Sequence, residues 1–345
     1  MTRFVAPLDT LGMFSAAAGM PEQIEEAARV AAEVTDLPEP DGIASVLVLG
    51  MGGSGMAGDL LAATAGPFLP VPVVVSKGYT PPSFVDENTL VFAISFSGNT
   101  EETLSATEMA VGAGARIVAI AAGGELAHLA SHWHAPVIPI DASIPMPRAG
   151  LGAVAIPPMV VLERLGLFTG ATEYVGRAVD QLRSRRDQLV LDGNPAQEMA
   201  RRIGRSVPVI YGGGEIGAVA ALRWKCQFNE NAELAAFTNQ VPEMCHNEIC
   251  GWGRDGDSTG QVFTLVELRH DHEHPQVMRR FDIISELLDD RMAVETVTAA
   301  GDGELAQLLD LVLFGDFVSL HAAVDAGLDP GPVPVLDDIK AALRP

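Results

Sequence analysis

The segment from Leu90 to Ala106, LVFAISFSGNTEETLSA, constrains the fold more than any other part of the chain. Its first five residues, 90–94, form a short apolar run typical of a buried strand, and a helical pattern follows the polar residues. Ser95, Ser97 and Thr100 stand between the two elements. The free N–H groups and the dipole at the start of a helix attract anions, and hydroxyl groups add hydrogen-bond donors. The segment therefore predicts a strand–loop–helix unit that binds a phosphate monoester.

An ordinary helix cap is the alternative interpretation, because Ser97 or Thr100 alone could cap the helix. Four hydroxyl or amide side chains stand within six residues, Asn99 among them, which exceeds what one cap requires. We therefore favour the phosphate site over plain capping.

The pattern of the whole chain predicts an α/β fold. Continuous apolar runs alternate with helical patterns, which is typical of a parallel, doubly wound sheet flanked by helices. The predicted strands of a first sheet lie at residues 45–49, 71–75, 90–94, 116–121 and 137–140. A second strand–glycine–helix unit follows at 207–220, with further strands at 262–268 and 293–297 and a helix at 305–326. The chain is thus expected to hold two α/β units of similar plan.

The expected domain boundaries follow from these patterns, and 345 residues suffice for two hydrophobic cores. We expect an N-terminal helical segment at 1–41, which includes a helix over 21–34, and a first domain at 42–165. A helical connection at 166–200, a second domain at 201–310 and C-terminal helices at 311–345, packing back on the domains, complete the prediction.

Composition excludes several classes of function. A net charge of −23 would repel a nucleic-acid backbone. No apolar run reaches the length of about 18 residues that a membrane span requires. The three cysteines, Cys226, Cys245 and Cys250, are odd in number and no secretory signal is evident, so we expect reduced thiols and a cytoplasmic protein. A nucleophilic role for any of them is disfavoured.

Gly50, Gly52 and Gly55 match the glycine fingerprint of dinucleotide-binding proteins. That interpretation requires an acidic residue near the end of the next strand, where this chain has Ser76 and Lys77. Lys77 could bind a 2′-phosphate, so the interpretation as an NADP site is weakened rather than excluded. We expect instead that the backbone of this loop, with Gly53 and Ser54, approaches a substrate at the carboxyl end of the strand.

A run of potential metal ligands occupies positions 270–274, with the sequence HDHEH. Imidazole and carboxylate groups suit zinc or manganese. Because these five residues are consecutive, their side chains would splay apart, and a solvated loop is the favoured interpretation. We expect no metal and no cofactor.

Several motifs, taken together, resemble those of known sugar-phosphate proteins. GMGGSGMAGDL at 50–60 and ISFSGNTEETL at 94–104 look like the two signature loops of SIS (sugar isomerase) domains. PRAGLG at 147–152, together with KCQFNENAELAAF and PEMCHNEICGW within 225–252, resembles the bifunctional phosphoglucose/phosphomannose isomerases. The resemblance continues to DPGPVPVLDDIKAAL at 329–343. It implies two SIS-type domains and interconversion of glucose 6-phosphate, and also mannose 6-phosphate, with fructose 6-phosphate.

The resemblance also implies roles for particular residues. Gly53, Ser54, Ser95, Ser97 and Thr100 would hold the substrate phosphate.

The catalytic residues would lie in the other motifs. Glu230 would move a proton between C2 and C1, and Arg148 would stabilise the enediolate. His246, supplied by the neighbouring subunit of a homodimer, would assist ring opening together with Lys340. Proton transfer between adjacent carbons needs one positioned carboxylate and a cation near the developing oxyanion, so these residue types suit the chemistry. Taken singly, Glu230 and Lys340 could equally be surface residues.

Two positions depart from the family pattern. Cys245 stands where the family commonly has Asn before the histidine, and Gly331 stands where it commonly has Thr. A lost hydroxyl near the sugar could change the balance between glucose and mannose phosphates. Two alternatives to the bifunctional isomerase stay open: a non-catalytic SIS-domain sensor of sugar phosphates, and an isomerase of another sugar or amino-sugar phosphate.

Overall fold

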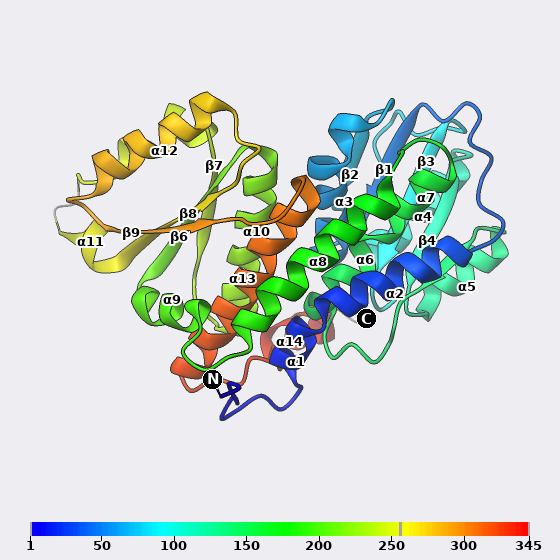
Figure 1. Cartoon of the computed structure of the whole chain (residues 1–345). Coiled ribbons are helices and arrows are strands. Elements are labelled where there is room, and N and C mark those ends of the chain that lie inside the picture. Colours follow the sequence, from blue (N-terminus) through cyan, green and yellow to red (C-terminus); the bar gives the residue numbers. More distant parts are fainter. Residues whose placement is uncertain (1, 255–256, 344–345) are drawn as a thin grey trace. The chain divides into compact units, whose positions relative to one another are not determined.

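The protein is described by a computed structural model that covers residues 2–254 and 257–343 (Figure 1). The chain forms two compact units. We call Gly19–Gln181 with Asp302–Ala306 the N-terminal unit. The C-terminal unit contains the preceding residues up to Ala18, Leu182–Gly301, and the chain from Gln307 onward. Two helices, α8 (Ala171–Leu189) and α13 (Glu304–Asp325), run from one unit into the other.

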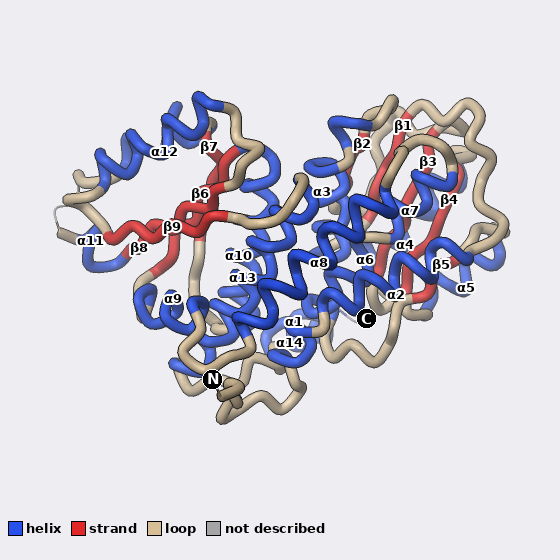
Figure 2. Tube along the Cα trace, viewed as in Figure 1, coloured by secondary structure: helices blue, strands red, loops and turns tan. Residues whose placement is uncertain are grey.

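The N-terminal unit contains a five-stranded parallel sheet, which confirms the predicted fold class for this half (Figure 2). Its order is β2-β1-β3-β4-β5, and every neighbouring pair is parallel. The strands are β1 (Ser45–Leu49), β2 (Val73–Ser76), β3 (Thr89–Ser95), β4 (Arg116–Ala121) and β5 (Val137–Pro139). All of β3 and nearly all of β1 are buried, because helices cover both faces and continuous apolar runs fit such strands.

Helices on the two faces of this sheet enclose its core. On one face, α4 (Glu101–Gly112) and α5 (Gly124–His132) pack on the odd-numbered side chains of β1 and β3. On the other face lies α3 (Gly52–Thr64), which packs against α6 (Leu151–Ala155). Helices α2 (Met20–Glu33) and α7 (Pro157–Arg164) pack in turn on α6 and on each other.

The C-terminal unit contains a second parallel sheet, in the order β7-β6-β8-β9. Its strands are β6 (Val207–Gly213), β7 (Phe237–Val241), β8 (Phe263–Arg269) and β9 (Ala293–Thr298). The flanking helices are α1 (Met13–Ala18), α9 (Pro195–Ile203), α10 (Gly214–Asn231), α11 (Ser258–Val262), α12 (Pro275–Leu288), the long α13 and α14 (Pro334–Leu343). Both halves therefore have the predicted α/β plan.

Strand β7 and helix α12 are among the elements of this unit that were not predicted from the sequence. Strand β7, FTNQV, lies at the sheet edge and carries three consecutive polar residues, so no apolar run marks it. Helix α12 buries Val277, Phe281, Ile284 and Leu288 against the sheet. Conversely, α14 has no buried residue among those described, so the structure does not show this helix packed back on a domain.

Helix α13 is, among the described residues, the one helix long and apolar enough to span a bilayer when judged by length and composition alone. Within the protein, 94% of its most apolar window is buried. In the C-terminal unit Trp224 of α10 stacks on Phe314 and donates a hydrogen bond of 2.8 Å to the Leu311 carbonyl. A buried ion pair at 2.8 Å between Arg223 and Asp316 also joins the two helices. This part of α13 is therefore a core helix of the unit.

The glycine fingerprint has a packing role in both units. A Cβ atom at Gly55, in the first turn of α3, would lie 2.7 Å from the Gly50 carbonyl oxygen at the end of β1. In the second unit, a Cβ at Gly212 would lie 1.9 Å from the Gly217 carbonyl oxygen. In each unit the two glycines are five residues apart and allow the helix to start directly against the strand it follows.

His321 is a buried histidine in an aromatic cluster of the C-terminal unit. Its ring packs against Phe4, Phe14 and Phe317 of the same unit, and Asn194 hydrogen-bonds its Nε2 at 3.0 Å. Burial, with a smaller effect of Arg201, lowers the pKa of His321 to about 4. The folded protein therefore keeps this imidazole neutral through the mildly acidic range.

We expect His321 to destabilise the fold in acid. Between pH 6.5 and about 4 the unfolded chain binds a proton here that the folded protein does not, so acidification favours unfolding. The loss should approach about 3 kcal/mol at the acidic end. Chemical denaturation of the wild type and of His321→Gln at several pH values measures this contribution as the difference between the two curves. Parallel curves for the two proteins would contradict the prediction.

Candidate functional site

The carboxyl edge of the first sheet has a switch point between β1 and β3. These strands are neighbours, and the chain leaves β1 toward β2 on one side but β3 toward β4 on the other. Ligands of open α/β sheets bind at such a point, because the two following helices begin on opposite faces and leave a crevice. Here those helices are α3 and α4, which contain the two predicted phosphate loops.

Neither of these helices is capped by a side chain. Met51 is the N-cap residue of α3 and Thr100 that of α4, and no side-chain capping bond forms at either. The Thr100 hydroxyl instead shares a hydrogen bond of 2.8 Å with Ser95, which is fully buried. Ordinary side-chain capping, the alternative interpretation of this loop, is therefore absent at the start of α4.

Other polar residues of the loop have local roles. The Ser97 hydroxyl is exposed and accepts a hydrogen bond from the Asn99 backbone at 3.2 Å. The Asn99 side chain accepts from the Glu125 backbone N–H at 3.1 Å, in the first turn of α5. The buried Ser54 hydroxyl accepts from the Phe96 backbone N–H at 3.3 Å and so ties the first turn of α3 to the end of β3.

Arg148 lies in a short turn that packs against this crevice. The turn, η2 (Pro147–Gly150), follows β5, and the Arg148 side chain is 4% exposed. A Cβ at Gly53 would meet the Pro147 carbonyl oxygen at 3.6 Å, and one at Gly150 would meet the Phe96 ring at 2.7 Å. The structure therefore brings the Arg148 turn together with Gly53 and the end of β3. Sequence analysis missed the contribution of Phe96, because contacts between distant segments leave no mark in a single sequence.

Lys77, considered above as a ligand of a 2′-phosphate, forms an ion pair with Asp59 of α3. The fingerprint glycines Gly50 and Gly55 pack against each other at the strand–helix turn. Close packing therefore accounts for the glycine spacing of this loop.

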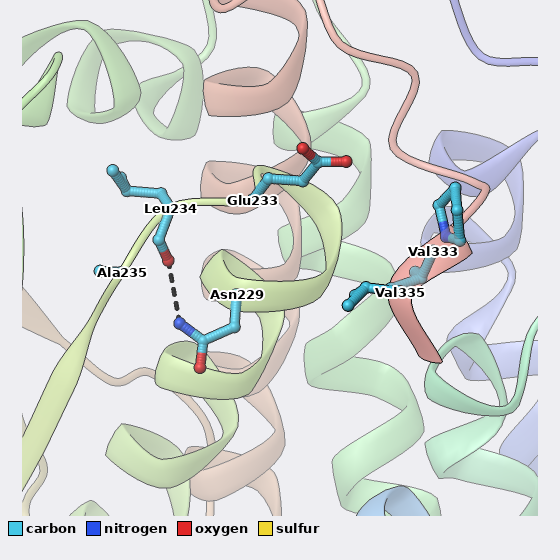
Figure 3. A pocket seen from close by; sticks show the side chains of 7 residues that line it. Asn229, Glu233, Leu234, Ala235, Val333 and Val335 are labelled. Atoms are coloured by element: carbon cyan, nitrogen blue, oxygen red, sulfur yellow. Dashed lines mark hydrogen bonds between the residues drawn. The ribbon is translucent and has the colours of Figure 1, made fainter. Parts of the chain in front are cut away.

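Glu230 lies in the last turn of α10, in the C-terminal unit, and is half-buried. The asparagines on its two sides anchor that turn. Asn229 donates to the Leu234 carbonyl at 2.9 Å, as Figure 3 shows, and Asn231 donates to the Ser319 hydroxyl of α13 at 2.9 Å. The Asn-Glu-Asn motif thus holds the backbone at the predicted base with a side-chain contact on each side.

A pocket of about 510 Å³ opens beside this turn within the C-terminal unit (Figure 3). Its walls come from the end of α10 with the loop after it, and from the start of α14 with the residue before it: Asn229, Glu233, Leu234, Ala235, Val333, Pro334 and Val335. The segment that contains the predicted Lys340 therefore begins next to the turn that contains Glu230.

The two remaining predicted catalytic residues are at the surface of the C-terminal unit. His246 is exposed at the end of η3 (Glu243–His246). Lys340 lies in α14 with its side chain 71% exposed, and its ammonium is 3.9 Å from the Asp337 carboxylate. Such an exposed pair restrains a lysine only weakly.

The switch point of the second sheet, between β6 and β8, is closed by protein side chains. His270 Nε2 is hydrogen-bonded to the Gly213 carbonyl at 2.8 Å, and Glu273 forms an ion pair with Arg269 at 3.0 Å. The expected solvated loop at 270–274 is wrong for His270 and Glu273, which are 5% and 6% exposed. His274 accepts a hydrogen bond from the Gln276 backbone and caps α12. Within 2–254 and 257–343, no group of three or more ligands that could hold a metal ion occurs.

Comparison with known proteins agrees with this architecture. The SIS domain family matches residues 43–145, and the bacterial phospho-glucose isomerase C-terminal SIS domain matches residues 192–343. The fold is similar to that of tagatose-6-phosphate ketose/aldose isomerase from Escherichia coli, with a TM-score of 0.71 and 16% identity over 96% of each chain. The chain is thus a double SIS-domain protein of the phosphosugar isomerase class.

Curated relatives define the family more narrowly. The chain is 34% identical to the bifunctional phosphoglucose/phosphomannose isomerase of Caldicellulosiruptor bescii, over 96% of this chain and 98% of that protein. The enzyme of the same name from Aquifex aeolicus is 35% identical over 87% of this chain and 90% of its own. The protein belongs to the family of bifunctional phosphoglucose/phosphomannose isomerases.

The two departures from the family pattern have local structural settings. The Cys245 thiol is half-buried, and burial raises its pKa, so it stays protonated at neutral pH. Gly331 is buried against Leu11: a Cβ there would lie 2.8 Å from Leu11 Cγ and 2.9 Å from its Cβ. A threonine at 331 would therefore require Leu11 to move.

We expect Gly331→Ala to lower the free energy of unfolding by about 1–3 kcal/mol, because the added methyl group overlaps Leu11. In a Leu11→Gly background, which lacks both the Cβ and the Cγ atom of Leu11, Gly331→Ala should be nearly neutral. Gly78→Ala is the control, since nothing lies within 4 Å of its Cβ position. Denaturant unfolding is measured for the wild type, the three single variants and the double variant, and equal losses from Gly331→Ala in both backgrounds would contradict the steric explanation.

We also expect Ser97→Ala to weaken binding of inorganic phosphate by about 10- to 100-fold, because its exposed hydroxyl is the one expected to donate a hydrogen bond to the charged ligand. Ser131→Ala is a matched control, because this exposed hydroxyl bonds within α5. Isothermal titration calorimetry measures both affinities. An unchanged affinity in Ser97→Ala would contradict the predicted contact.

Proposed function

We propose that the protein is an aldose–ketose isomerase that interconverts glucose 6-phosphate and mannose 6-phosphate with fructose 6-phosphate. The observation that carries this proposal is the similarity to a curated enzyme of that name over 98% of its length. The uncapped helix starts at the first switch point and the anchored Glu230 are consistent with a phosphorylated substrate and a carboxylate base.

The substrate phosphate is bound at the β1/β3 switch point. Gly53, Ser54, Ser95, Ser97 and Thr100 supply backbone and hydroxyl donors there, and the dipoles of α3 and α4 favour the negative charge. The protein has a net charge of −23, so long-range attraction cannot supply the affinity and local donors must do so.

Glu230 is the base of the isomerisation. In the aldose, it removes the proton from C2, and the electron pair of that bond forms the C1–C2 double bond of a cis-enediolate with negative charge on O1. The same carboxyl group returns the proton to C1, while the O2 hydroxyl proton moves to O1 and the C2 carbonyl forms. Arg148, a guanidinium that is always charged, stabilises the enediolate oxygens.

Ring opening precedes this step and needs an acid and a base at the ring oxygen and the anomeric hydroxyl. We assign it to His246 and Lys340. Both side chains are exposed in the single chain, which fits a role completed by a second subunit. We therefore propose a homodimer in which His246 serves the neighbouring subunit's substrate, in a cytoplasmic protein that needs neither metal nor organic cofactor.

The proposed domain boundaries remain 42–165 and 201–310 for the two SIS-type domains, with helical segments at 1–41, 166–200 and 311–345. A non-catalytic sugar-phosphate sensor would also use the phosphate loops but would have no use for a base at Glu230. The assay of isomerase activity therefore distinguishes the two functions, because a sensor would bind sugar phosphates without converting them.

We expect Glu230→Gln to lower kcat by about 10³-fold and to leave binding of a sugar-phosphate analogue unchanged, because the amide cannot accept the proton. Glu198→Gln is the matched control, an exposed glutamate of α9 outside the pocket beside Glu230, and it should keep full activity. Full turnover in Glu230→Gln would exclude the assigned base.

The substrate range is tested in the same preparation. With fructose 6-phosphate and no added metal, the wild type should form both glucose 6-phosphate and mannose 6-phosphate, measured by product-specific coupled assays. Formation of glucose 6-phosphate alone would mean that the family departures at Cys245 and Gly331 narrowed the substrate range of the enzyme. Tight binding without either product, or turnover of glucosamine 6-phosphate alone, would overturn the proposal.

A further inference from the structure

The loop around His246 consists of two short turns, η3 and η4 (Glu248–Gly251), which lie against the second sheet. His246 is exposed, whereas Met244, two residues before it, is fully buried in the core formed with β6, β7 and α12. The backbone before His246 is therefore fixed by packing. The backbone after it is held by packing of Ile249 and Trp252 against the same core and by polar contacts that centre on Glu248.

Both carboxylate oxygens of Glu248 are occupied by donors from the sheet. The Tyr211 hydroxyl, in β6, donates to Oε1 at 2.6 Å, and the Asn239 amide, in β7, donates to Oε2 at 2.7 Å. One carboxylate therefore ties η4 to two adjacent strands. Hydrogen bonds to a charged acceptor are about twice as strong as those between neutral groups.

The Tyr211 donor is itself held in place. Its side chain is fully buried, and the Trp252 indole N–H donates to the tyrosine oxygen at 2.8 Å. Trp252 packs edge-on against Phe263, with ring centroids 5.4 Å apart. Burial, and then the neighbouring Glu248 carboxylate, raises the pKa of Tyr211, so the phenol keeps the proton that it donates.

Asn247, the residue after His246, connects the two turns. The Asn247 side chain accepts a hydrogen bond of 2.6 Å from the Glu248 backbone N–H and donates one of 3.0 Å to the Glu243 carboxylate. Glu243 and Glu248 are the first residues of the two turns. His246 is thus the last residue of a turn that Asn247 joins to the next turn, and the sheet holds that second turn through Glu248.

We propose that Glu248 is a positioning residue for His246: with Tyr211 and Asn239 it holds the His246 loop where the imidazole can act on the sugar ring. This inference rests on the function proposed above. An exposed imidazole on a free loop would sample many orientations, and reactions between oriented groups lose rate steeply when one group is misplaced. A fixed backbone on both sides supplies the orientation that the exposed side chain lacks.

A double-mutant cycle tests the proposal with the full-length enzyme. In Glu248→Gln one of the two side-chain oxygens becomes an NH₂ group, which cannot accept a hydrogen bond. The side chain can then no longer accept hydrogen bonds from both Tyr211 and Asn239 through separate oxygens. We expect kcat to fall by about 10- to 100-fold with KM nearly unchanged, since binding of the phosphate does not involve this loop. In a His246→Ala background the same substitution should change kcat by less than about 2-fold.

One further variant tests the same network, and a second is a control. Tyr211→Phe keeps the ring but removes the donor to Glu248, and it should lower kcat in the same way and with the same dependence on His246. Glu267→Gln alters another buried carboxyl group of the same sheet, which accepts from Ser285 at 3.0 Å and has no contact with the His246 loop among the described bonds. It should leave kcat unchanged. Circular dichroism and thermal unfolding check that each variant folds.

The possible results separate this inference from the proposed function. If His246→Ala lowers kcat but Glu248→Gln and Tyr211→Phe do not, the positioning role is wrong and the isomerase stands. If Glu248→Gln lowers kcat equally with and without His246, the network acts on overall stability and the inference is overturned. If His246→Ala leaves kcat unchanged, the ring-opening role assigned to His246 fails first.

Discussion

The strand-to-helix turn after the first strand of each sheet depends on a backbone contact that excludes side chains. Gly55 against Gly50, and Gly217 against Gly212, allow α3 and α10 to start directly on the strands that precede them. Because these helices start so close to the sheet, their first turns lie at its carboxyl edge. In the first unit α3 begins there without a side-chain cap, and in the second unit the turn sets the direction of α10, whose last turn contains Glu230.

The two units use the same switch point differently. In the first sheet the point between β1 and β3 is lined by small hydroxyl residues and by helix starts without side-chain caps. In the second sheet His270, Glu273 and Arg269 fill the corresponding point with hydrogen bonds and an ion pair. The first switch point therefore suits the proposed phosphate site, whereas side chains of the protein itself occupy the second.

Much of the fold could be predicted because buried parallel strands are continuous apolar runs, as in LVFAI before Ser95. The edge strand FTNQV has no such run, and its place in the sheet follows only from pairing with β6. The HDHEH run was misjudged for the converse reason. Each residue is polar, yet the fold buries two of them: His270 pairs with Gly213, which is distant in the sequence, and Glu273 pairs with Arg269, four residues before it.

The sequence by itself determined the family, the α/β class and the residue types of the candidate site, because motifs such as SFSGNT and NEN place chemistry-bearing residues at fixed spacings on predictable elements. Only the tertiary structure decided what orients them. Ser95 pairs with Thr100, the Arg148 turn packs on Phe96, and Glu248 is held by Tyr211 and Asn239. These contacts join segments that are distant in the chain or face one another only after folding, and the geometry of a hydrogen bond depends on where the backbone lies, which spacing in a sequence does not specify.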